Sequence, residues 1–434
     1  MERTTESEIK FPDSGIEIPS SESNSFKFYR GVFFKALSKM RKGSIRLVLP
    51  NGEKAYLGNP ESDDPTEFHK GIIHIHNPVF FKKTVLNGDL GFSESYMDGD
   101  WDTDDIRGII SWFLYNLEDS PSVSGSRNRF AHLSWTNLGS RLLHLFRRNS
   151  IAGSKKNIVE HYDLGNDFYN KFLDPTMTYS CAYFKTMEES LEKAQLAKLE
   201  ILCKKLRLQE SDHLLEIGTG WAGLSTYAAK QYGCKVTTYT ISEEQYRYAN
   251  EKIRKEHLSD RIEVRLADYR KVEGQYDKLV TVEMLEAVGH EYFEDFFAMC
   301  NRVLKKDGIM AHQIITSPDS RYESFRKGVD FIQKHIFPGS LLPSIARINQ
   351  AINRTSDFHL HSLEDIGIKY DHTLMTWLKG FDSNIALIRD MGFDESFIRK
   401  WRYYFSYCAA AFSMRNISVV QVVYTRPNNL SLRS

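Results

Sequence analysis

The second part of the chain alternates short apolar, β-branched runs with longer amphipathic stretches. The runs HLLEIG, KVTTYT, IEVRLAD, DKLVTVE and GIMAHQIIT follow one another with segments of helical period between them. Strands that alternate with helices in this way are typical of a doubly wound parallel sheet. We therefore expect an α/β domain over residues 157–434, with a helical insertion at about 318–412 and a last strand in ISVVQVVYT.

The part of the chain before residue 157 has a different pattern. SIRLVLPNGEKAYLG alternates apolar and polar positions on both sides of a Pro-Asn-Gly turn, which predicts a β-hairpin, and IRGIISWFLYNL has helical character. These segments indicate a smaller α+β domain at 26–119. Residues 1–25 are polar and rich in Ser and Glu, which predicts a disordered tail. Residues 120–156 read as a linker with a basic amphipathic helix.

The composition excludes several classes of protein. The 434-residue chain has 57 Lys and Arg against 57 Asp and Glu, so its zero net charge argues against a nucleic-acid partner. No apolar stretch approaches the ~20 residues of a membrane span. The five scattered cysteines include no CxxC pair, which indicates a reducing compartment and no metal site. The N-terminus does not resemble a signal peptide, so we expect a cytoplasmic protein.

A glycine-rich turn follows the first predicted strand. Gly218, Gly220 and Gly223 form a G-x-G-x-x-G motif, which occurs in sites for NAD, FAD and S-adenosylmethionine and is also compatible with a turn that binds nothing. Glu216, just before the first glycine, favours a methyltransferase. Thr240 ends the second strand where an NAD site usually has an acid, which disfavours a dehydrogenase.

Two acids follow later strands of this domain. Asp268 is a candidate for an adenine contact, with a helix N-cap as the alternative interpretation. Glu283 ends the fourth strand, where we expect it to face the methionine end of the cofactor. Both positions lie at the carboxyl ends of strands, where open α/β sheets bind their ligands.

Six motifs in order resemble cyclopropane-fatty-acyl-phospholipid synthases. They are HYDLGNDFYNKFLDPTMTYSCAYF, LLEIGTGWAG, TYTISEEQ, VEMLEAVGHEYF, DFIQKHIFPGSLLPS and IGIKYDHTLMTW. The resemblance is dense over 157–424, and GFSESYMDGDWDTDDI extends it weakly into the N-terminal domain. It implies a class I, Rossmann-like methyltransferase. Such enzymes use S-adenosylmethionine to convert a cis double bond of a phospholipid acyl chain into a cyclopropane.

The resemblance also implies roles for individual residues. A bicarbonate ion in the family's active site would be held here by Cys181, Glu286, His312, the amide of Ile314 and Tyr370. The implied cofactor positions, together with those found above, are Tyr179, Ser180, Glu216, Gly218, Gly220, Gly223, Thr240, Gln245, Asp268 and Glu283. The chain departs from the family at Thr219, which stands for a cysteine in the glycine loop, and at Ala287, which stands for a histidine seen in some members.

The implied chemistry explains why these groups are needed. A double bond attacks the sulfonium methyl and leaves a carbocation, which a dry pocket must protect until bicarbonate removes a proton and the ring closes. The motifs leave open a methylene- or methyl-branched product, and a small-amine N-methyltransferase is a further alternative. A lipid-binding protein with an inactive cofactor fold is disfavoured by the intact motifs. A nucleophilic role for Cys181 is disfavoured because no His/Asn motif accompanies it.

The distribution of charge suggests a partner for such an enzyme. Glu94–Asp119 contains eight acids and one arginine, a net charge of −7, whereas Arg127–Lys156 contains seven bases and no acid, a net charge of +7. We interpret the basic block as a candidate contact with the surface of a phospholipid bilayer, which would make the protein peripherally membrane-associated. The alternative is that the acidic block neutralises it. The resemblance also suggests a homodimer.

Overall fold

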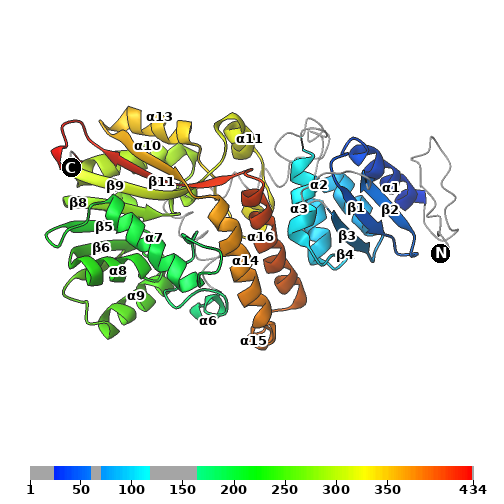
Figure 1. Cartoon of the computed structure of the whole chain (residues 1–434), viewed down its shortest axis with the longest axis horizontal. Helices are drawn as coiled ribbons and strands as arrows, with labels where there is room; N and C mark the ends of the chain where they lie inside the picture. Colours follow the sequence, from blue (N-terminus) through cyan, green and yellow to red (C-terminus); the bar gives the residue numbers. More distant parts are fainter. Residues whose placement is uncertain (1–23, 60–69, 118–163, 433–434) are drawn as a thin grey trace. The chain divides into compact units, whose positions relative to one another are not determined.

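The computed structural model describes residues 24–59, 70–117 and 164–432. The chain divides into two compact units, one within Met1–Ser134 and one within Trp135–Ser434, and each unit has its own sheet (Figure 1). The predicted linker helix at 120–156 lies outside the described residues, as does nearly all of the predicted tail. Among the described helices, none is long and apolar enough to cross a membrane.

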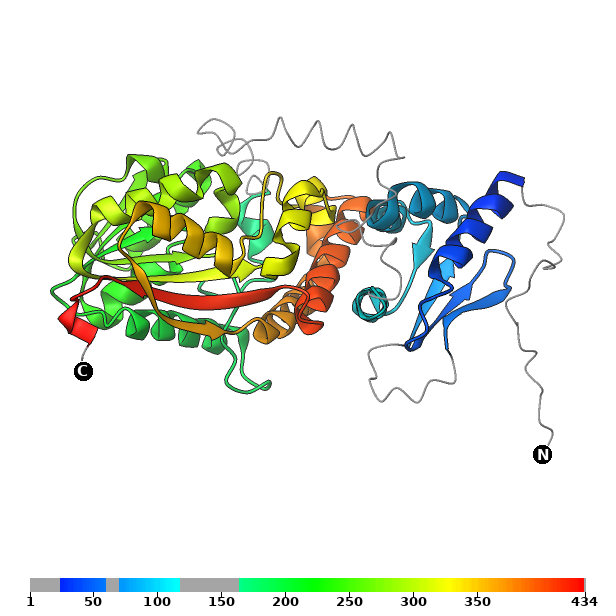
Figure 2. The same cartoon turned by 90° about the horizontal axis from the view of Figure 1, so that it is seen from above.

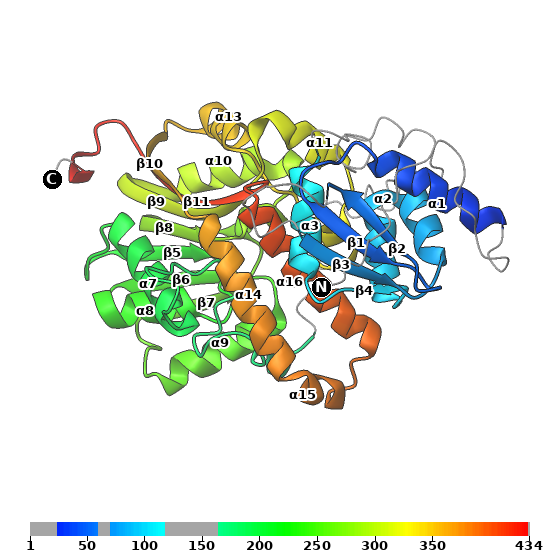
Figure 3. The same ribbon diagram turned by 45° about the vertical axis from the view of Figure 1, so that its right-hand side comes forward.

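The N-terminal unit contains a four-stranded sheet in the order β2-β1-β3-β4. β1 and β2 pair antiparallel across a turn at Gly52, whose φ of +82° suits a residue without a Cβ, so the predicted hairpin is confirmed. β1 and β3 are parallel, and Figure 3 shows these three strands side by side. The elements are α1 (Asn24–Leu37), β1 (Ser44–Val48), β2 (Lys54–Gly58), β3 (Lys70–Ile75), α2 (Val79–Met97), β4 (Trp101–Asp102) and α3 (Ile106–Tyr115).

Aromatic side chains form much of the core of this unit. Phe33, Phe80 and Phe81 are buried and meet edge to face with centroids 5.2–5.5 Å apart. The rings of Phe92 and Trp101 are 4.4 Å apart, and the Trp101 indole donates a hydrogen bond to the carbonyl oxygen of Phe92. This core joins α1, α2 and β4, so the unit has the means to fold around its own centre.

Several acids of the block Glu94–Asp119 have partners inside the N-terminal unit. Lys83 Nζ lies 2.7 Å from an Asp98 carboxylate oxygen and 2.5 Å from one of Asp100. Asp105 caps α3 by accepting a hydrogen bond from the N–H of Gly108 at 2.8 Å. These acids therefore have structural roles that do not depend on the basic block.

The second unit is built on a seven-stranded sheet in the order β10-β11-β9-β8-β5-β6-β7. Strands β5 to β9 are mutually parallel, whereas β11 runs antiparallel to β9 and to β10. All six predicted strands are present, and the doubly wound α/β fold is confirmed. The strands are β5 (His213–Ile217), β6 (Lys235–Thr240), β7 (Ile262–Leu266), β8 (Tyr276–Val282), β9 (Leu304–Thr316), β10 (His359–Asp365) and β11 (Ser418–Thr425).

Helices cover both faces of this sheet (Figures 1 and 2). One apolar cluster joins α7, α8 and α9 to one face, with Leu202 and Ala228 fully buried. The other joins α10 and α13 to the opposite face, with Phe296 and Ile348 fully buried. The helices are α7 (Leu191–Lys205), α8 (Gly223–Tyr232), α9 (Glu243–Lys255), α10 (Phe293–Val303) and α13 (Ile345–Thr355).

The segment 318–412 differs in part from the predicted helical insertion. It contains α11 (Tyr322–Lys327), α12 (Phe331–His335), α13, α14 (Ile368–Ser383), α15 (Ile385–Asp390) and α16 (Glu395–Ser413), and also the edge strand β10. The prediction missed β10 because its residues are mostly exposed, so HLHSLED lacks a buried apolar face. α14 and α16 lie side by side and meet through rings such as Trp377 and Phe405 (Figure 1).

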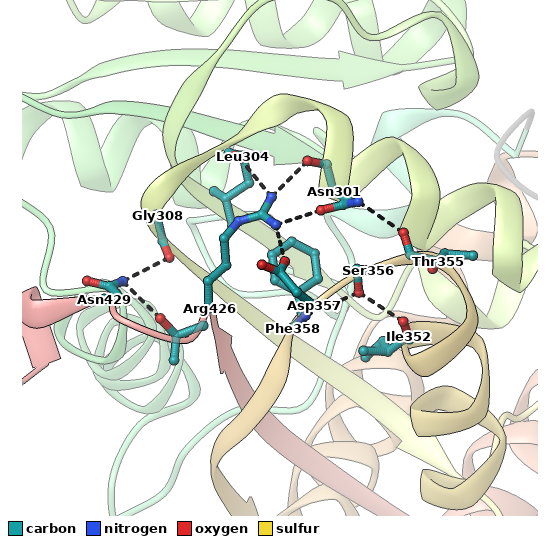
Figure 4. A network of polar contacts seen from close by, with 11 residues as sticks. Asn301, Leu304, Gly308, Ile352, Thr355, Ser356, Asp357, Phe358, Arg426 and Asn429 are labelled. Atoms are coloured by element: carbon teal, nitrogen blue, oxygen red, sulfur yellow. Dashed lines mark hydrogen bonds and ion pairs between the residues drawn. The ribbon is translucent and has the colours of Figure 1, made fainter.

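A buried arginine fixes the end of β11 (Figure 4). The Arg426 guanidinium donates to the side-chain and main-chain oxygens of Asn301 at 2.6 and 2.8 Å and to the carbonyl oxygen of Leu304 at 3.1 Å. It also pairs with Asp357 and lies over the Phe358 ring, 4.4 Å from its centroid. The last strand is thereby tied to α10 and to the turn that follows α13.

Candidate active site

The carboxyl edge of the second sheet brings together four of the predicted cofactor positions. Gly218, Thr240, Asp268 and Glu283 end or directly follow β5, β6, β7 and β8, which are neighbours in the sheet. Parallel strands place their carboxyl ends at one edge, and the turns there are open to a ligand. The edge is therefore the candidate cofactor site.

The glycine-rich turn between β5 and α8 has the backbone shape that its sequence predicts. Gly218 and Gly220 have φ values of +97° and +51°, and Ala222 is also left-handed at +60°. A Cβ built on Gly220 would meet nothing within 4 Å, which leaves room for a ligand to approach the backbone there. Thr219 turns inward and bonds to Thr238 at 2.8 Å, so its side chain does not enter that space.

Two predicted cofactor residues have contacts that stabilise the fold. The Glu216 carboxylate is buried and accepts hydrogen bonds from the hydroxyls of Ser225 on α8 and Thr238 on β6; burial raises its pKa to about 7. A Cβ on Gly223 would lie 2.9 Å from the hydroxyl oxygen of Thr178. We therefore assign these two positions to packing around the loop.

Polar groups beyond the loop are tied to one another. Thr240 Oγ1 donates to Gln245 Oε1 at 2.9 Å, at the start of α9. Asp268 accepts the N–H of Arg270 at 3.0 Å and lies 3.7 Å from its guanidinium, so the N-cap interpretation of this acid is correct. The side chains of Thr240 and Asp268 are nearly buried at the carboxyl edge of the sheet, beside the candidate cofactor site.

The segment before α7 brings two more predicted residues to this edge. The Tyr179 hydroxyl donates to that of Tyr404 on α16 at 3.0 Å. The Ser180 hydroxyl accepts from Nζ of Lys198 at 2.6 Å. Lys198 is fully buried, and its desolvation lowers its pKa to about 8.

Glu283 is the centre of the polar contacts at the end of β8. Its Oε1 accepts from the main-chain N–H of Cys181 at 2.8 Å and from Nε2 of Gln313 at 2.9 Å. Its Oε2 accepts from the Tyr370 hydroxyl at 2.7 Å. The donors come from the segment before α7, from β9 and from α14, so three separate parts of the chain converge on one carboxylate.

The placement of His312 differs from its predicted position beside Cys181. Its side chain points to the opposite face of the sheet, where it is fully buried against Phe296 and Phe297. Nδ1 bonds to Thr281 at 2.7 Å, and burial lowers its pKa to about 3. The prediction was one residue out of register, and successive side chains of a strand face opposite sides, so Gln313 occupies the site instead.

The same shift of one residue affects the predicted amide of Ile314. The side chain of Ile314 packs in the apolar core with Phe296, and the N–H that reaches Glu286 belongs to Ile315, 2.5 Å from Oε1. Burial, with the nearby Glu283 as a smaller cause, raises the pKa of Glu286 to about 8. The raised pKa favours the protonated form of Glu286, and its Oε2 has no hydrogen-bond partner among the described residues.

Cys181 contributes its backbone to the site. Its thiol donates to the carbonyl oxygen of Ala182, while its N–H reaches Glu283. Burial, and then the charge of Glu283, raise the pKa of the thiol well above its ordinary value. A thiol held neutral in this way is a poor nucleophile, which agrees with the prediction that Cys181 is not a covalent catalyst.

A buried chain of hydrogen bonds fixes the orientation of Gln313. Lys205 Nζ donates to Gln421 Oε1 at 2.7 Å, and Gln421 Nε2 donates to Gln313 Oε1 at 2.9 Å. The amide nitrogen of Gln313 must then face Glu283 and the carbonyl oxygen of Cys181. Sequence reasoning missed Gln313 because a glutamine in a buried strand has no motif of its own.

Aromatic rings surround this cluster. Tyr370 stacks obliquely on Phe412 at 4.6 Å, and Tyr179 lies 5.1 Å from Trp377 and 6.3 Å from Phe337. These rings come from the segment before α7, from α14 and α16, and from the loop after α12. Aromatic faces stabilise nearby positive charge and exclude water, so this wall suits a cationic group.

The residues found here do not fit a bound bicarbonate. The Tyr370 hydroxyl, one of its implied ligands, donates to Glu283, and the thiol of Cys181, another, donates to the carbonyl oxygen of Ala182. His312 faces the other side of the sheet. A bicarbonate ion bound here would lie beside the Glu283 carboxylate, which already accepts hydrogen bonds from Tyr370 and Gln313. Two neighbouring negative charges repel each other.

The fold and the site define a class of protein. A doubly wound sheet, a glycine turn after its first strand and polar groups at the carboxyl edge are the features of class I S-adenosylmethionine-dependent methyltransferases. A solved cyclopropane synthase MmaA2 from Mycobacterium tuberculosis has the same fold, with a TM-score of 0.59 and 28% identity. That match covers 63% of this chain and 98% of the other.

Sequence comparisons give the family. The model of the mycolic acid cyclopropane synthetase family matches residues 150–422, so the chain belongs to this family of methyltransferases. It is 38% identical to the cyclopropane-fatty-acyl-phospholipid synthase of Escherichia coli K12, over 83% of this chain and 89% of that protein. It is 32% identical to the tuberculostearic acid methyltransferase UfaA1 of M. tuberculosis, over 87% and 86% of the two chains.

Proposed function

We propose that this enzyme transfers a methylene group from S-adenosylmethionine to the cis double bond of an unsaturated phospholipid acyl chain and forms a cyclopropane. The observation that supports this most directly is the 38% identity to the E. coli synthase, which extends over both units of the chain. The site also supports the proposal. The turn at Gly218 and Gly220 suits the cofactor, and the Glu283 carboxylate and the rings of Tyr179 and Trp377 come from neighbouring elements.

The geometry is suited to the chemistry of this reaction. An alkene is a weak nucleophile, so it must be held close to the sulfonium methyl and in line with the breaking bond. The product of attack is a carbocation. Tyr179, Trp377 and Tyr370 present rings on one side of the site, and Glu283 presents a carboxylate. Both kinds of group stabilise positive charge. Bicarbonate is not part of this proposal, because the Tyr370 hydroxyl is bonded to Glu283 and His312 faces the other side of the sheet.

The test is an incubation with S-adenosylmethionine and vesicles of unsaturated phosphatidylglycerol and phosphatidylethanolamine. We expect fatty esters heavier by about 14 daltons that do not take up hydrogen over a catalyst, as read by mass spectrometry. Vesicles of fully saturated lipid are the control and should give no gain. Absence of any mass gain on the unsaturated lipid would refute the proposal.

A second candidate product is a methylene- or methyl-branched acyl chain. The 32% identity to a tuberculostearic acid methyltransferase supports a branched product as the second candidate. The first step is the same, and loss of a different proton gives the methylene branch. The methyl branch forms only when a reductant then adds two hydrogens to that methylene. A methylene branch takes up hydrogen, whereas the cyclopropane of the same mass does not, so the same assay separates the two.

We also propose that the enzyme works at a bilayer surface, as a peripherally bound cytoplasmic protein. The basic block Arg127–Lys156 lies outside the described residues, and its positive charge would attract it to an anionic lipid surface. The enzyme also has to reach an acyl chain, which lies within the bilayer. Reversing the charges of Arg141, Arg147 and Arg148 should abolish sedimentation with anionic liposomes; unchanged binding would refute this. A homodimer, the other proposed association, would double the mass measured by light scattering.

A further inference from the structure

The Glu283 carboxylate lies where the resemblance would place a bound anion. It accepts hydrogen bonds from the Cys181 N–H, from Gln313 and from Tyr370, at 2.7–2.9 Å. One of these donors, the Tyr370 hydroxyl, is a group that the resemblance assigns to bicarbonate. The N–H belongs to Cys181, another implied ligand, and Gln313 stands one residue from the expected histidine. The residue as a whole is of intermediate burial, and its carboxylate lies among donors from the segment before α7, from β9 and from α14.

The backbone of Glu283 is in a conformation that most residues avoid. Its φ is +50°, in the left-handed region, which is unfavourable for a residue with a Cβ. Its N–H is held by the carbonyl oxygen of Gln313 at 2.7 Å. Glycine would relieve the strain, and strained non-glycine residues cluster at functional sites, which makes Glu283 a candidate for such a role.

We propose that the Glu283 carboxylate is the base that removes the proton from the transferred methyl carbon, so that this enzyme carries its catalytic anion in its own chain and needs no bicarbonate. The proposal rests on the function proposed above. It changes the predicted role of Glu283 from cofactor contact to general base.

The step balances without any other reactant. The alkene forms a bond to the methyl carbon as the S–CH₃ bond breaks, and the cofactor leaves as a neutral thioether. The remaining carbocation then loses a proton from the new methyl carbon to an oxygen of Glu283, and the electron pair of that C–H bond forms the second bond of the ring. Glu283 returns its proton to solvent after the product leaves.

The charged and titratable neighbours are consistent with this role. Burial raises the pKa of Glu283, whereas its hydrogen bonds to Gln313, Cys181 and Tyr370 and the charge of Lys198 on α7 act in the opposite direction and favour the carboxylate form. Burial and the nearby charge of Glu283 raise the pKa of Glu286, after β8, which favours its neutral form. Tyr370 on α14 and Cys181 are both held in their neutral forms by burial, and the amide of Gln313 on β9 cannot take the proton.

The first test removes bicarbonate from the assay. The wild-type enzyme is assayed with S-adenosylmethionine and unsaturated vesicles in buffer purged of carbon dioxide, with and without added sodium bicarbonate. We expect the two rates to agree within about twofold. A rate that collapses without bicarbonate and recovers with it would overturn the proposal, whereas a wild-type enzyme that forms no product in either buffer would instead refute the proposed function.

Substitutions at Glu283 make the second test. Glu283→Gln keeps the shape but not the base, and we expect kcat to fall by at least about 100-fold while the Kd for S-adenosylmethionine stays within about threefold by calorimetry. Glu283→Gly frees the three donors, and we expect its activity to become dependent on added bicarbonate or formate. Glu200→Gln is the control, because it alters a tyrosine-bonded carboxylate between α7 and α8 and should leave the rate unchanged.

Two results would overturn the inference at this stage. One is a Glu283→Gln variant with nearly wild-type kcat. The other is a folded Glu283→Gln variant that no longer binds S-adenosylmethionine, which would return this residue to a cofactor-binding role. If the glutamine variant does not fold, as judged by thermal unfolding, the bicarbonate dependence of the wild-type and Glu283→Gly enzymes decides the question.

Discussion

At the scale of the residue, the chemistry of the site depends on which atom of each side chain or backbone faces Glu283. Cys181 offers an N–H, Gln313 an amide nitrogen and Tyr370 a hydroxyl. Hydrogen bonds to a charged acceptor are worth about 1.5–3 kcal/mol each, more than a bond between neutral groups. Three such bonds fix the position of the carboxylate, so its orientation toward a substrate is set before the substrate binds.

The Tyr370 hydroxyl gives one prediction at this scale. Tyr370→Phe removes one donor from Glu283 and keeps the ring against Phe412, so we expect kcat to fall about 10- to 100-fold with little change in the Kd for S-adenosylmethionine. The measurements are vesicle assays and calorimetry. Tyr232→Phe, which removes a phenol from the Glu200 carboxylate, is the matched control and should keep its rate. Equal rates for both variants would contradict the role of the hydroxyl.

Glu286 gives a prediction about stability and pH. Its ordinary pKa of 4.5 applies to the unfolded chain and about 8 to the folded protein, so between these values the folded state binds more protons. The free energy of unfolding should therefore fall as the pH rises through this window, by about 1.4 kcal/mol per pH unit from this group.

Glu286→Gln is neutral at every pH and should lose that part of the slope. The measurement is the guanidinium midpoint of the wild type and the variant at about pH 5 and pH 8. The variant should gain stability relative to the wild type at the higher pH. Glu216, whose pKa of about 7 acts in the same direction, is present in both proteins and cancels. Parallel pH profiles would contradict a raised pKa for Glu286.

At the scale of the element, strand β9 separates the candidate site from the packed core. His312 and Ile314 point into the core beside α10, whereas Gln313 points to the Glu283 carboxylate. Alternation along a strand makes this separation complete, because a shift of one residue moves every side chain to the other face. α14 then brings Tyr370 over the end of β8, and α16 supports α14 through aromatic contacts.

Substitutions of neighbouring residues on β9 test this assignment. Gln313→Leu removes a donor from Glu283, and we expect a loss of about 10- to 100-fold in kcat. His312→Leu removes the bond to Thr281, and we expect lower stability with a rate within about threefold of the wild type. The measurements are vesicle assays and chemical unfolding of both variants. The reverse pattern of rates would place His312 in the site after all.

At the scale of the whole molecule, the chain consists of two units with separate cores. The solved cyclopropane synthase MmaA2 matches over 98% of its own length but over only 63% of this chain. In the N-terminal unit, Asp98, Asp100 and Asp105 have partners of their own. The zero net charge of the chain is therefore not evidence that the acidic block neutralises Arg127–Lys156.

A truncated chain tests the independence of the second unit. Residues 157–434 expressed alone should fold cooperatively and bind S-adenosylmethionine with a Kd within about threefold of the full chain. Circular dichroism during unfolding and calorimetry measure these properties. A fragment that is unfolded, or that binds the cofactor much more weakly, would show that the N-terminal unit completes the site.

The sequence by itself determined the class of fold and most of the framework of the site. The β-branched runs predicted six strands, because a buried parallel sheet requires apolar residues in short uninterrupted segments. The glycines of the first turn predicted the cofactor edge, since their positive φ values are rare for other residues. β10 escaped prediction because an exposed edge strand needs no apolar pattern.

Only the tertiary structure decided the chemistry at the centre of the site. Cys181, Glu283, Gln313 and Tyr370 are separated by up to 189 positions in the sequence, and no local pattern states which of them face one another. The register of β9 determined that Gln313 is used and His312 is not, because alternate residues of a strand face opposite layers. The sequence predicts Glu283 as a cofactor contact. In the folded chain, hydrogen bonds from Cys181 and Tyr370 converge on its carboxylate.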